Sequence, residues 1–115
     1  MAALYRKHLL HWRNTSSMTD QLISTFIEKW LDFDLQLREK RGLDGDSLEV
    51  LMDLLEQIEI GLEGQGSIPK NLAGIFLDMW GSMTSNADMY DQDMQSKIYQ
   101  AADHLADCAR GICMG

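Results

Sequence analysis

The stretch from Thr19 to Arg41, TDQLISTFIEKWLDFDLQLREKR, decides the fold class of this chain. Its large apolar residues recur at spacings of three and four, as Ile23, Phe26, Ile27, Trp30, Phe33 and Leu37. This period places them on one side of an α-helix rather than on alternate faces of a strand. Thr19 or Ser17 is suited to cap the start of the helix, and Gly42 to end it. We therefore predict an amphipathic helix over about residues 19–41.

Three further segments show the same helical period. We predict helices over about residues 47–62, 67–83 and 87–110, with Ser47 as the cap of the first and Pro69 in the first turn of the second. The last segment alternates spacings of four and three, which is typical of a central packing helix. Its small side chains allow neighbouring helices to approach closely, and they are Ala101, Ala102, Ala106 and Ala109.

The composition supports an all-α fold and a single core. The 115 residues are 45% hydrophobic and include eight Met, one Pro and one Val, so helix formers far outnumber strand formers. Short connections favour antiparallel neighbours. We predict a compact antiparallel bundle of four main helices, preceded by a short N-terminal helix or extension.

Charge divides the chain into two parts. Residues 1–17 carry three basic and no acidic side chains, whereas residues 18–115 carry seven basic and 18 acidic ones, a net charge of −11. We predict a basic N-terminal helix or extension over 1–17 and an acidic bundle domain over 18–115. The overall charge of −8 argues against nucleic acid and anionic membranes as ligands. The absence of a long apolar run and of a signal sequence predicts a cytoplasmic protein with two reduced thiols.

Acidic residues concentrate in the middle of the chain. Between Gly42 and Ser96 there are eleven of them, and Lys70 is the only base. Four follow one another along one face of the helix predicted over 47–62, namely Glu49, Asp53, Glu56 and Glu63. A solvated face of this kind keeps a domain soluble. A field of one sign also steers an oppositely charged partner, so both interpretations stay open.

A second acidic cluster follows the third predicted helix. Met89 projects away from the apolar stripe of the fourth helix, so Met89 and Tyr90 are candidate apolar anchors with a rim of acids. Together with the first cluster, they give the predicted partner-binding residues: Glu49, Asp53, Glu56, Glu63, Asp88, Met89, Tyr90, Asp91 and Asp93.

The leading hypothesis is a small acidic module that neutralises or masks a basic partner protein, without catalysis, metal or cofactor. In size, acidity and helical content the chain resembles colicin-type immunity proteins. The resemblance implies an immunity or antitoxin-like inhibitor, or a nucleic-acid mimic, with a toxin or nuclease as its partner. The oligomeric state is open.

Two acid-x-x-acid pairs support an alternative hypothesis. Glu56 with Glu59, and Asp88 with Asp91, resemble the carboxylate pairs of the all-α pyrophosphohydrolases related to MazG. That resemblance implies Mg²⁺ held by these four residues and hydrolysis of a nucleotide. The chain differs in having Asp88 where the family has Glu, and no basic cluster lies nearby. A helical adaptor or homo-oligomerising bundle is a third possibility, based on the regular stripe of the fourth helix.

Three carboxylates fall within the apolar arcs of their predicted helices: Asp34, Glu59 and Asp91. A buried carboxylate needs a partner, so each would be protonated, paired with Arg38 or Arg41, or bound to a hard cation. All three also lie near predicted helix ends, where a side chain reaches water. We expect the solvated arrangement.

Overall fold

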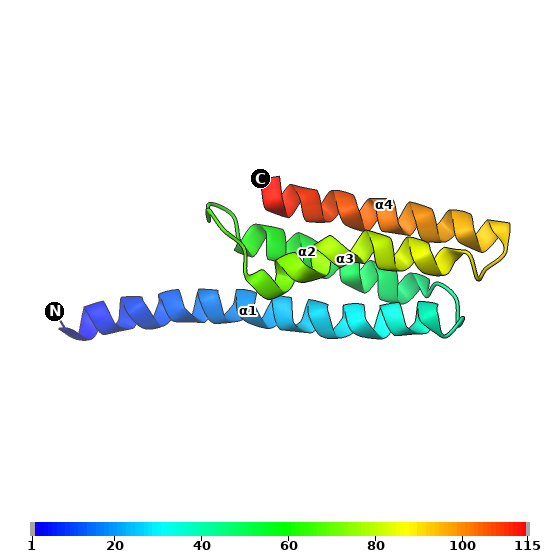
Figure 1. Cartoon of the computed structure of the whole chain (residues 1–115). Helices are drawn as coiled ribbons and strands as arrows, with labels where there is room; N and C mark the ends of the chain where they lie inside the picture. The colour runs from blue at the N-terminus through cyan, green and yellow to red at the C-terminus, as the bar shows by residue number, and fades with distance from the viewer. Residues whose placement is uncertain (1, 115) are drawn as a thin grey trace.

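The chain folds into a bundle of helices. The computed structural model describes the backbone of residues 2–114 and the side chains of residues 18–114. Its helices are α1 (Ala2–Arg38), α2 (Gly45–Gly61), α3 (Lys70–Ala87) and α4 (Gln92–Met114), and residues 2–114 contain no strand. In Figure 1, α1 and α3 run one way and α2 and α4 run the other way. The predicted all-α bundle of four main helices is confirmed.

The four helices are arranged so that each has two neighbours. α1 packs against α2 and α3, and α4 packs against the same two helices. The pairs α1–α2 and α3–α4 are antiparallel neighbours, as the short connections predict (Figure 1). α2 and α3 are consecutive in sequence but lie diagonally, because the connection over residues 62–69 crosses the end of the bundle. None of the helices within residues 2–114 combines the length and apolar character needed to cross a bilayer.

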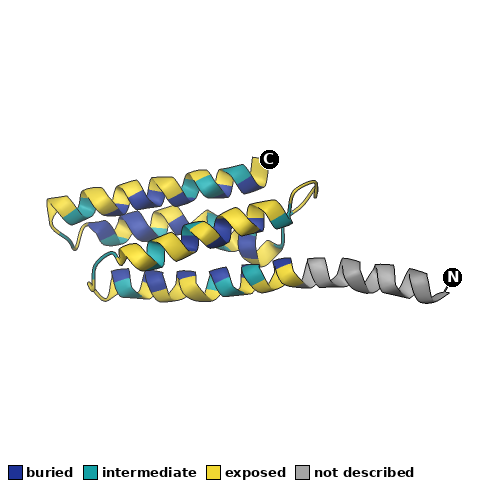
Figure 2. Ribbon diagram, turned by 180° about the vertical axis from the view of Figure 1, so that it is seen from behind, coloured by how far each residue is buried: buried dark blue, intermediate teal, exposed yellow. Residues whose placement is uncertain are grey.

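The apolar stripes meet in one core. On α1 every predicted stripe residue except Ile27 is buried, and Phe26 and Leu37 are fully buried. On α4, Ala101, Ala102 and Ala109 are buried, so the backbones of α2 and α3 can approach. Figure 2 shows the buried residues on the helix faces that turn toward one another. The periodicity therefore predicted the core-facing side of α1.

The predicted start of the first helix is wrong. α1 begins at Ala2 and passes through Ser17 and Thr19, so neither residue is a cap. Thr19 is instead a packing position, because a Cβ atom added to Gly61 would lie 2.6 Å from its Oγ1 atom. Only glycine permits this approach of α2 to α1. The side chains of residues 1–17, on which the predicted basic extension depends, lie outside those that the structure describes.

The end of α1 is also set by a different residue than expected. Lys40 adopts the left-handed conformation with φ 62°, and the Arg41 N–H donates to the Gln36 carbonyl at 2.9 Å. With the Lys40 N–H donating to the Leu37 carbonyl, these contacts form a Schellman motif. Gly42, with φ 91°, lies beyond the helix and turns the chain toward α2.

The cap of α2 is Asp44 rather than Ser47. One Asp44 carboxylate oxygen accepts from the Asp46 N–H at 3.1 Å, and the other accepts from the Ser47 hydroxyl at 2.8 Å. The hydroxyl of Ser47 lowers the pKa of Asp44; burial opposes this shift, and the backbone N–H groups of Asp46 and Ser47 add to it. The sequence could not separate Asp44 from Ser47, three residues later, because both residue types suit the cap position.

The boundary between the last two helices lies later than predicted. α3 continues past Gly81 to Ala87, which is fully buried, so the predicted end near Met83 is wrong. α4 starts at Gln92 rather than near residue 87. Asp91 caps it, since its carboxylate accepts from the Met94 N–H at 2.9 Å.

Candidate functional site

The three carboxylates predicted on apolar arcs have different environments. Asp34 is buried, with 6% of its surface exposed, whereas Glu59 and Asp91 are exposed. The Ser82 hydroxyl donates to Asp34 at 2.6 Å, and the Arg38 guanidinium pairs with its other oxygen at 2.8 Å. The expectation of solvation is therefore wrong for Asp34, which follows the predicted alternative of pairing with Arg38. This carboxylate links α1 to α3.

The acids of α2 form an exposed surface without bases. We call Glu49, Asp53, Glu56, Glu59 and Glu63 the acidic face, and all five are exposed. Ion pairs among residues 18–114 join Arg38 to Asp34, Arg41 to Glu39 and Arg110 to Asp107. None of these pairs includes a carboxylate of the acidic face. The negative charge of α2 is thus not neutralised by the described basic side chains.

The acidic face continues onto α4. The Glu59 carboxylate lies over Gly111, where an added Cβ would be 3.5 Å from its Oε1 atom. The pKa of the half-buried Cys108 thiol is raised by burial first, and then by the charges of Glu59, Asp107 and Glu56. Carboxylates from two helices therefore act on one point between α2 and α4. The sequence did not predict that Asp107 acts on the same thiol as Glu59 and Glu56. This effect requires α2 to pack against α4, which depends on the path of the connection over residues 62–69.

An exposed apolar side chain lies within the acidic face. Ile60 is 66% exposed, and on the helix it is a near neighbour of Glu56 and Glu63. A large apolar residue surrounded by charge is the arrangement of a binding hot spot. Ile60 was not among the predicted site residues, although its position off the apolar stripe of α2 was visible in the sequence.

The predicted anchors after α3 are partly used within the fold. Asp88, Met89 and Asp93 are exposed, as a binding role requires. The Tyr90 hydroxyl, however, donates to the Leu37 carbonyl at 2.7 Å and accepts from the Gly42 N–H at 3.2 Å. It ties the α3–α4 connection to the end of α1.

The predicted partner-binding residues do not form one compact cluster. The connection over 88–91 lies at the end of the bundle where α2 begins, as Figure 1 shows. Glu63 follows the other end of α2, about 20 Å from Glu49 at the helical rise of 1.5 Å per residue. The arrangement is a stripe along α2 with a second group of acids beyond its beginning.

The four carboxylates of the alternative metal site do not lie together. Glu59 lies over Gly111 near the end of α4, whereas Asp91 caps the beginning of that helix. The helical rise separates these two levels by about 30 Å. Among the residues whose side chains are described, no three His, Cys, Asp or Glu side chains are placed to hold one metal ion.

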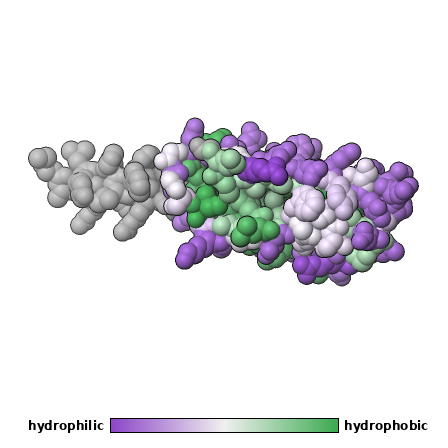
Figure 3. Space-filling model, turned by 45° about the horizontal axis from the view of Figure 1, so that its top comes forward, coloured by the Kyte–Doolittle hydropathy of each residue, from purple (hydrophilic) through white to green (hydrophobic). Residues whose placement is uncertain are grey.

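An apolar groove lies on the other side of α4, between α3 and α4. Its side chains are Ala73, Phe76, Leu77, Trp80, Ala106, Ala109, Arg110, Cys113 and Met114. Leu77 and Met114 are 84% and 82% exposed. Figure 3 shows hydrophobic surface gathered at one end of the described bundle. We call this surface the apolar groove.

Sequence reasoning did not find the apolar groove. The spacing of Leu72, Phe76 and Trp80 predicts that Trp80 lies on the apolar arc of its helix. Trp80 is instead exposed, and its indole N–H donates to Asp103 at 2.8 Å. The only sequence signal was Leu77, a large apolar residue off the stripe of its helix. The groove itself depends on which side of α3 faces α4.

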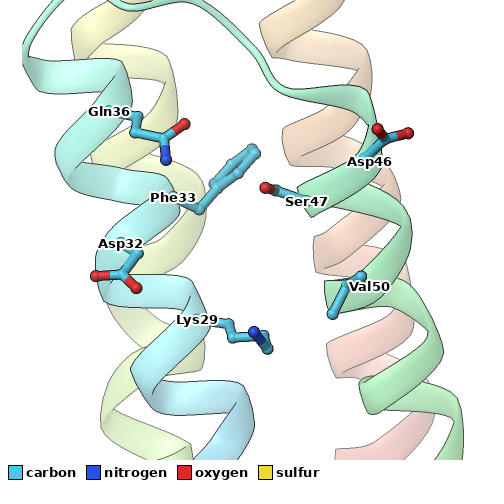
Figure 4. A pocket seen from close by; sticks show the side chains of 7 residues that line it. All are labelled: Lys29, Asp32, Phe33, Gln36, Asp46, Ser47 and Val50. Carbon is cyan, nitrogen blue, oxygen red and sulfur yellow. The ribbon is translucent and has the colours of Figure 1, made fainter.

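A second concave surface lies between α1 and α2. Lys29, Asp32, Phe33, Gln36, Asp46, Ser47 and Val50 line it. Figure 4 shows Phe33 and Ser47 pointing toward each other across the gap, while Asp46 points away from it. It mixes one base with two acids and brings no nucleophile together with a general base. Its composition does not indicate a reaction.

The fold and surfaces define a small all-α bundle with one acidic and one apolar surface. Comparison of the chain with protein-family models, curated proteins and solved structures gives no match. Its function is therefore inferred from its own side chains.

Proposed function

We propose that this chain is a binding module without catalytic activity, whose acidic face docks on a basic surface of a partner protein. The observation that supports it is the row of exposed carboxylates on α2 with no ion pair to a described base. Like charges at helical spacings of three and four destabilise a helix slightly. The same field accelerates the encounter with a cationic surface.

The docking has an electrostatic and an apolar component. The acidic face steers the partner and sets the salt dependence of association. Ile60, within the acidic face, and Met89, beside Asp88, offer apolar contact area that slows dissociation. The partner that fits this surface is a cationic protein such as a nuclease or toxin. The carboxylates of the acidic face would occupy the basic groups with which such a partner binds the phosphates of nucleic acid. Inhibition by masking is the proposed outcome.

The proposal is tested with decalysine as a cationic probe, by isothermal titration calorimetry at low salt. The full chain is compared with a triple variant, Glu49→Lys/Asp53→Lys/Glu56→Lys. The matched control, Asp20→Lys/Glu28→Lys/Asp32→Lys, makes the same change in net charge on the exposed side of α1. We expect the α2 variant to weaken binding at least about tenfold more than the α1 variant, because nearby charges dominate over distant ones. Equal losses in the two variants would show that only net charge matters, and would overturn the proposal.

A further inference from the structure

The apolar groove is a surface that the proposed function does not use. It lies between α3 and α4, whereas the acidic face lies on α2 and meets the other side of α4. Its lining includes the small residues Ala73 and Ala106 and the exposed side chains of Leu77 and Met114. Small residues in an apolar groove allow a helix to approach closely, in the manner of helix-in-groove recognition.

The rim of the apolar groove favours a basic occupant. Trp80 and Arg110 line the groove, and each is bound to an acid of α4: Trp80 donates to Asp103, and Arg110 pairs with Asp107. Arg110 and Asp107 neutralise each other, so the charge left beside the groove is that of Asp103, which makes no ion pair with a described base. The described chain from residue 18 onward is acidic overall, so the basic segment of this sequence is residues 1–17.

The buried stripe of α1 continues in sequence beyond the bundle. Thr19, Ile23 and Phe26 are buried at alternating spacings of four and three. Upstream, the same alternation passes through residues that include two aromatic side chains and a leucine: Ser16, Trp12, Leu9 and Tyr5. Such a pattern marks a helix face that packs against another helix.

The two helices beside α1 stop at the same level. α2 ends at Gly61, opposite Thr19. α3 runs parallel to α1 with Phe76 packed edge-on against Phe26, so its first residue, Lys70, is level with about residue 20. Neither α2 nor α3 extends further along α1, so these two helices end at the level where the upstream stripe begins.

We propose that residues 2–17 of one copy of the chain seat in the apolar groove of a second copy and join the two chains into a dimer. The same chain cannot supply the occupant while α1 is one helix from Ala2 to Arg38, because a continuous helix does not fold back on its own bundle. The apolar stripe meets Leu77 and Met114, and the basic side chains Arg6, Lys7 and Arg13 meet the acids of the rim.

The oligomeric state of the full chain tests this proposal. Light scattering after size exclusion, at tens of micromolar protein, is expected to give twice 13.1 kDa. The groove variant Leu77→Ser/Met114→Ser and the stripe variant Leu9→Ser/Trp12→Ser should each weaken the dimer at least about tenfold. The control Leu31→Ser/Leu35→Ser changes two exposed apolar residues of α1 and should leave the mass unchanged. A monomeric full chain, or a dimer that the groove variant leaves intact, would overturn the proposal.

Cysteine cross-linking identifies the occupant of the groove directly, since Cys113 lines it. In a Cys108→Ser background, Leu9→Cys is oxidised with oxidised glutathione, which accepts the electrons of the two thiols. We expect a covalent dimer on a non-reducing gel, and none from the control Leu31→Cys. A monomer with an internal disulfide, or no disulfide, would contradict a second copy as occupant. Because the groove variants keep every acid of α2, their effect is separable from a failure of decalysine binding.

Discussion

Asp34 on α1 is buried and held by Arg38 and Ser82, whereas Glu49 and Asp53 on α2 are exposed and make no ion pair with a described base. Two regions of one acidic chain thus use the same chemical group in opposite ways. At Asp34 the surrounding donors compensate for the loss of water. On α2 water solvates the carboxylates, and their mutual repulsion is left in place. The first arrangement stabilises the fold, and the second leaves charge available for a partner.

The largest effect on stability is expected from removal of the Asp34 carboxylate. Asp34→Ala should lower the free energy of unfolding by about 2 kcal/mol, because Ser82 loses its acceptor and a small void remains. The loss of Arg38 as a partner adds little, since its guanidinium is mostly exposed. Urea unfolding followed by circular dichroism gives the value.

Two variants sharpen this result. Asp32→Ala, at an exposed position of the same helix, should change stability by no more than about 0.5 kcal/mol. Asp34→Asn keeps an acceptor for Ser82 and should fall between the two. Equal stabilities of the Asp34→Ala and Asp32→Ala proteins would mean that the link between α1 and α3 is not stabilising.

The opposite sign is expected for a charge reversal on the acidic face. Asp53→Lys turns the repulsive pairs with Glu49 and Glu56 into attractive ones, which should stabilise the protein by about 0.5–1 kcal/mol at low salt. The gain should shrink as salt screens the charges. The control Asp20→Lys, which has no acid three or four residues away on α1, should give a smaller change. If Asp53→Lys lowers the stability of the protein, the carboxylates of α2 do not repel one another as we infer.

The contrast between these regions shows what the sequence could predict. The spacing of Ile23, Phe26 and Trp30 predicted which side of α1 is buried, because a helix fixes the direction of each side chain. It could not predict that Asp34 meets Ser82, since that contact depends on how α1 and α3 are placed. That Glu59 and Asp107 both act on the Cys108 thiol depends in the same way on the diagonal connection over 62–69.

Side chains with two possible roles limited the prediction of the site. An exposed Tyr90 would suit a binding anchor, but its hydroxyl donates to the Leu37 carbonyl. These two residues are far apart in sequence, so the sequence did not indicate this contact. The helical period likewise predicted that Asp91 points toward the core. That prediction failed because α4 starts at Gln92 and not near residue 87. Ile60 and Leu77 were readable as apolar residues off a stripe, but only the fold shows the surfaces to which they belong.

A smaller effect is expected from the cap of α2. The folded-state pKa of Asp44 is lowered, mainly by the Ser47 hydroxyl, so its contribution is present above the ordinary aspartate pKa and lost as pH falls through the lowered value. The stability difference between the parent and Asp44→Ala should be clear at pH 7 and narrow toward pH 3. Ser47→Ala should reduce this pH dependence. A difference that stays constant from pH 7 to pH 3 would argue against the cap.

Titration of the Cys108 thiol tests most directly whether negative charge concentrates between α2 and α4. In a Cys113→Ser background, thiolate absorbance near 240 nm reports this single thiol. We expect a pKa above the ordinary thiol value, due first to burial and then to Glu59, Asp107 and Glu56. The pKa should fall in Glu56→Gln/Glu59→Gln and with added salt, and stay unchanged in the control Asp20→Asn/Glu28→Gln. A pKa that responds to neither the α2 substitutions nor salt would contradict an unneutralised acidic face.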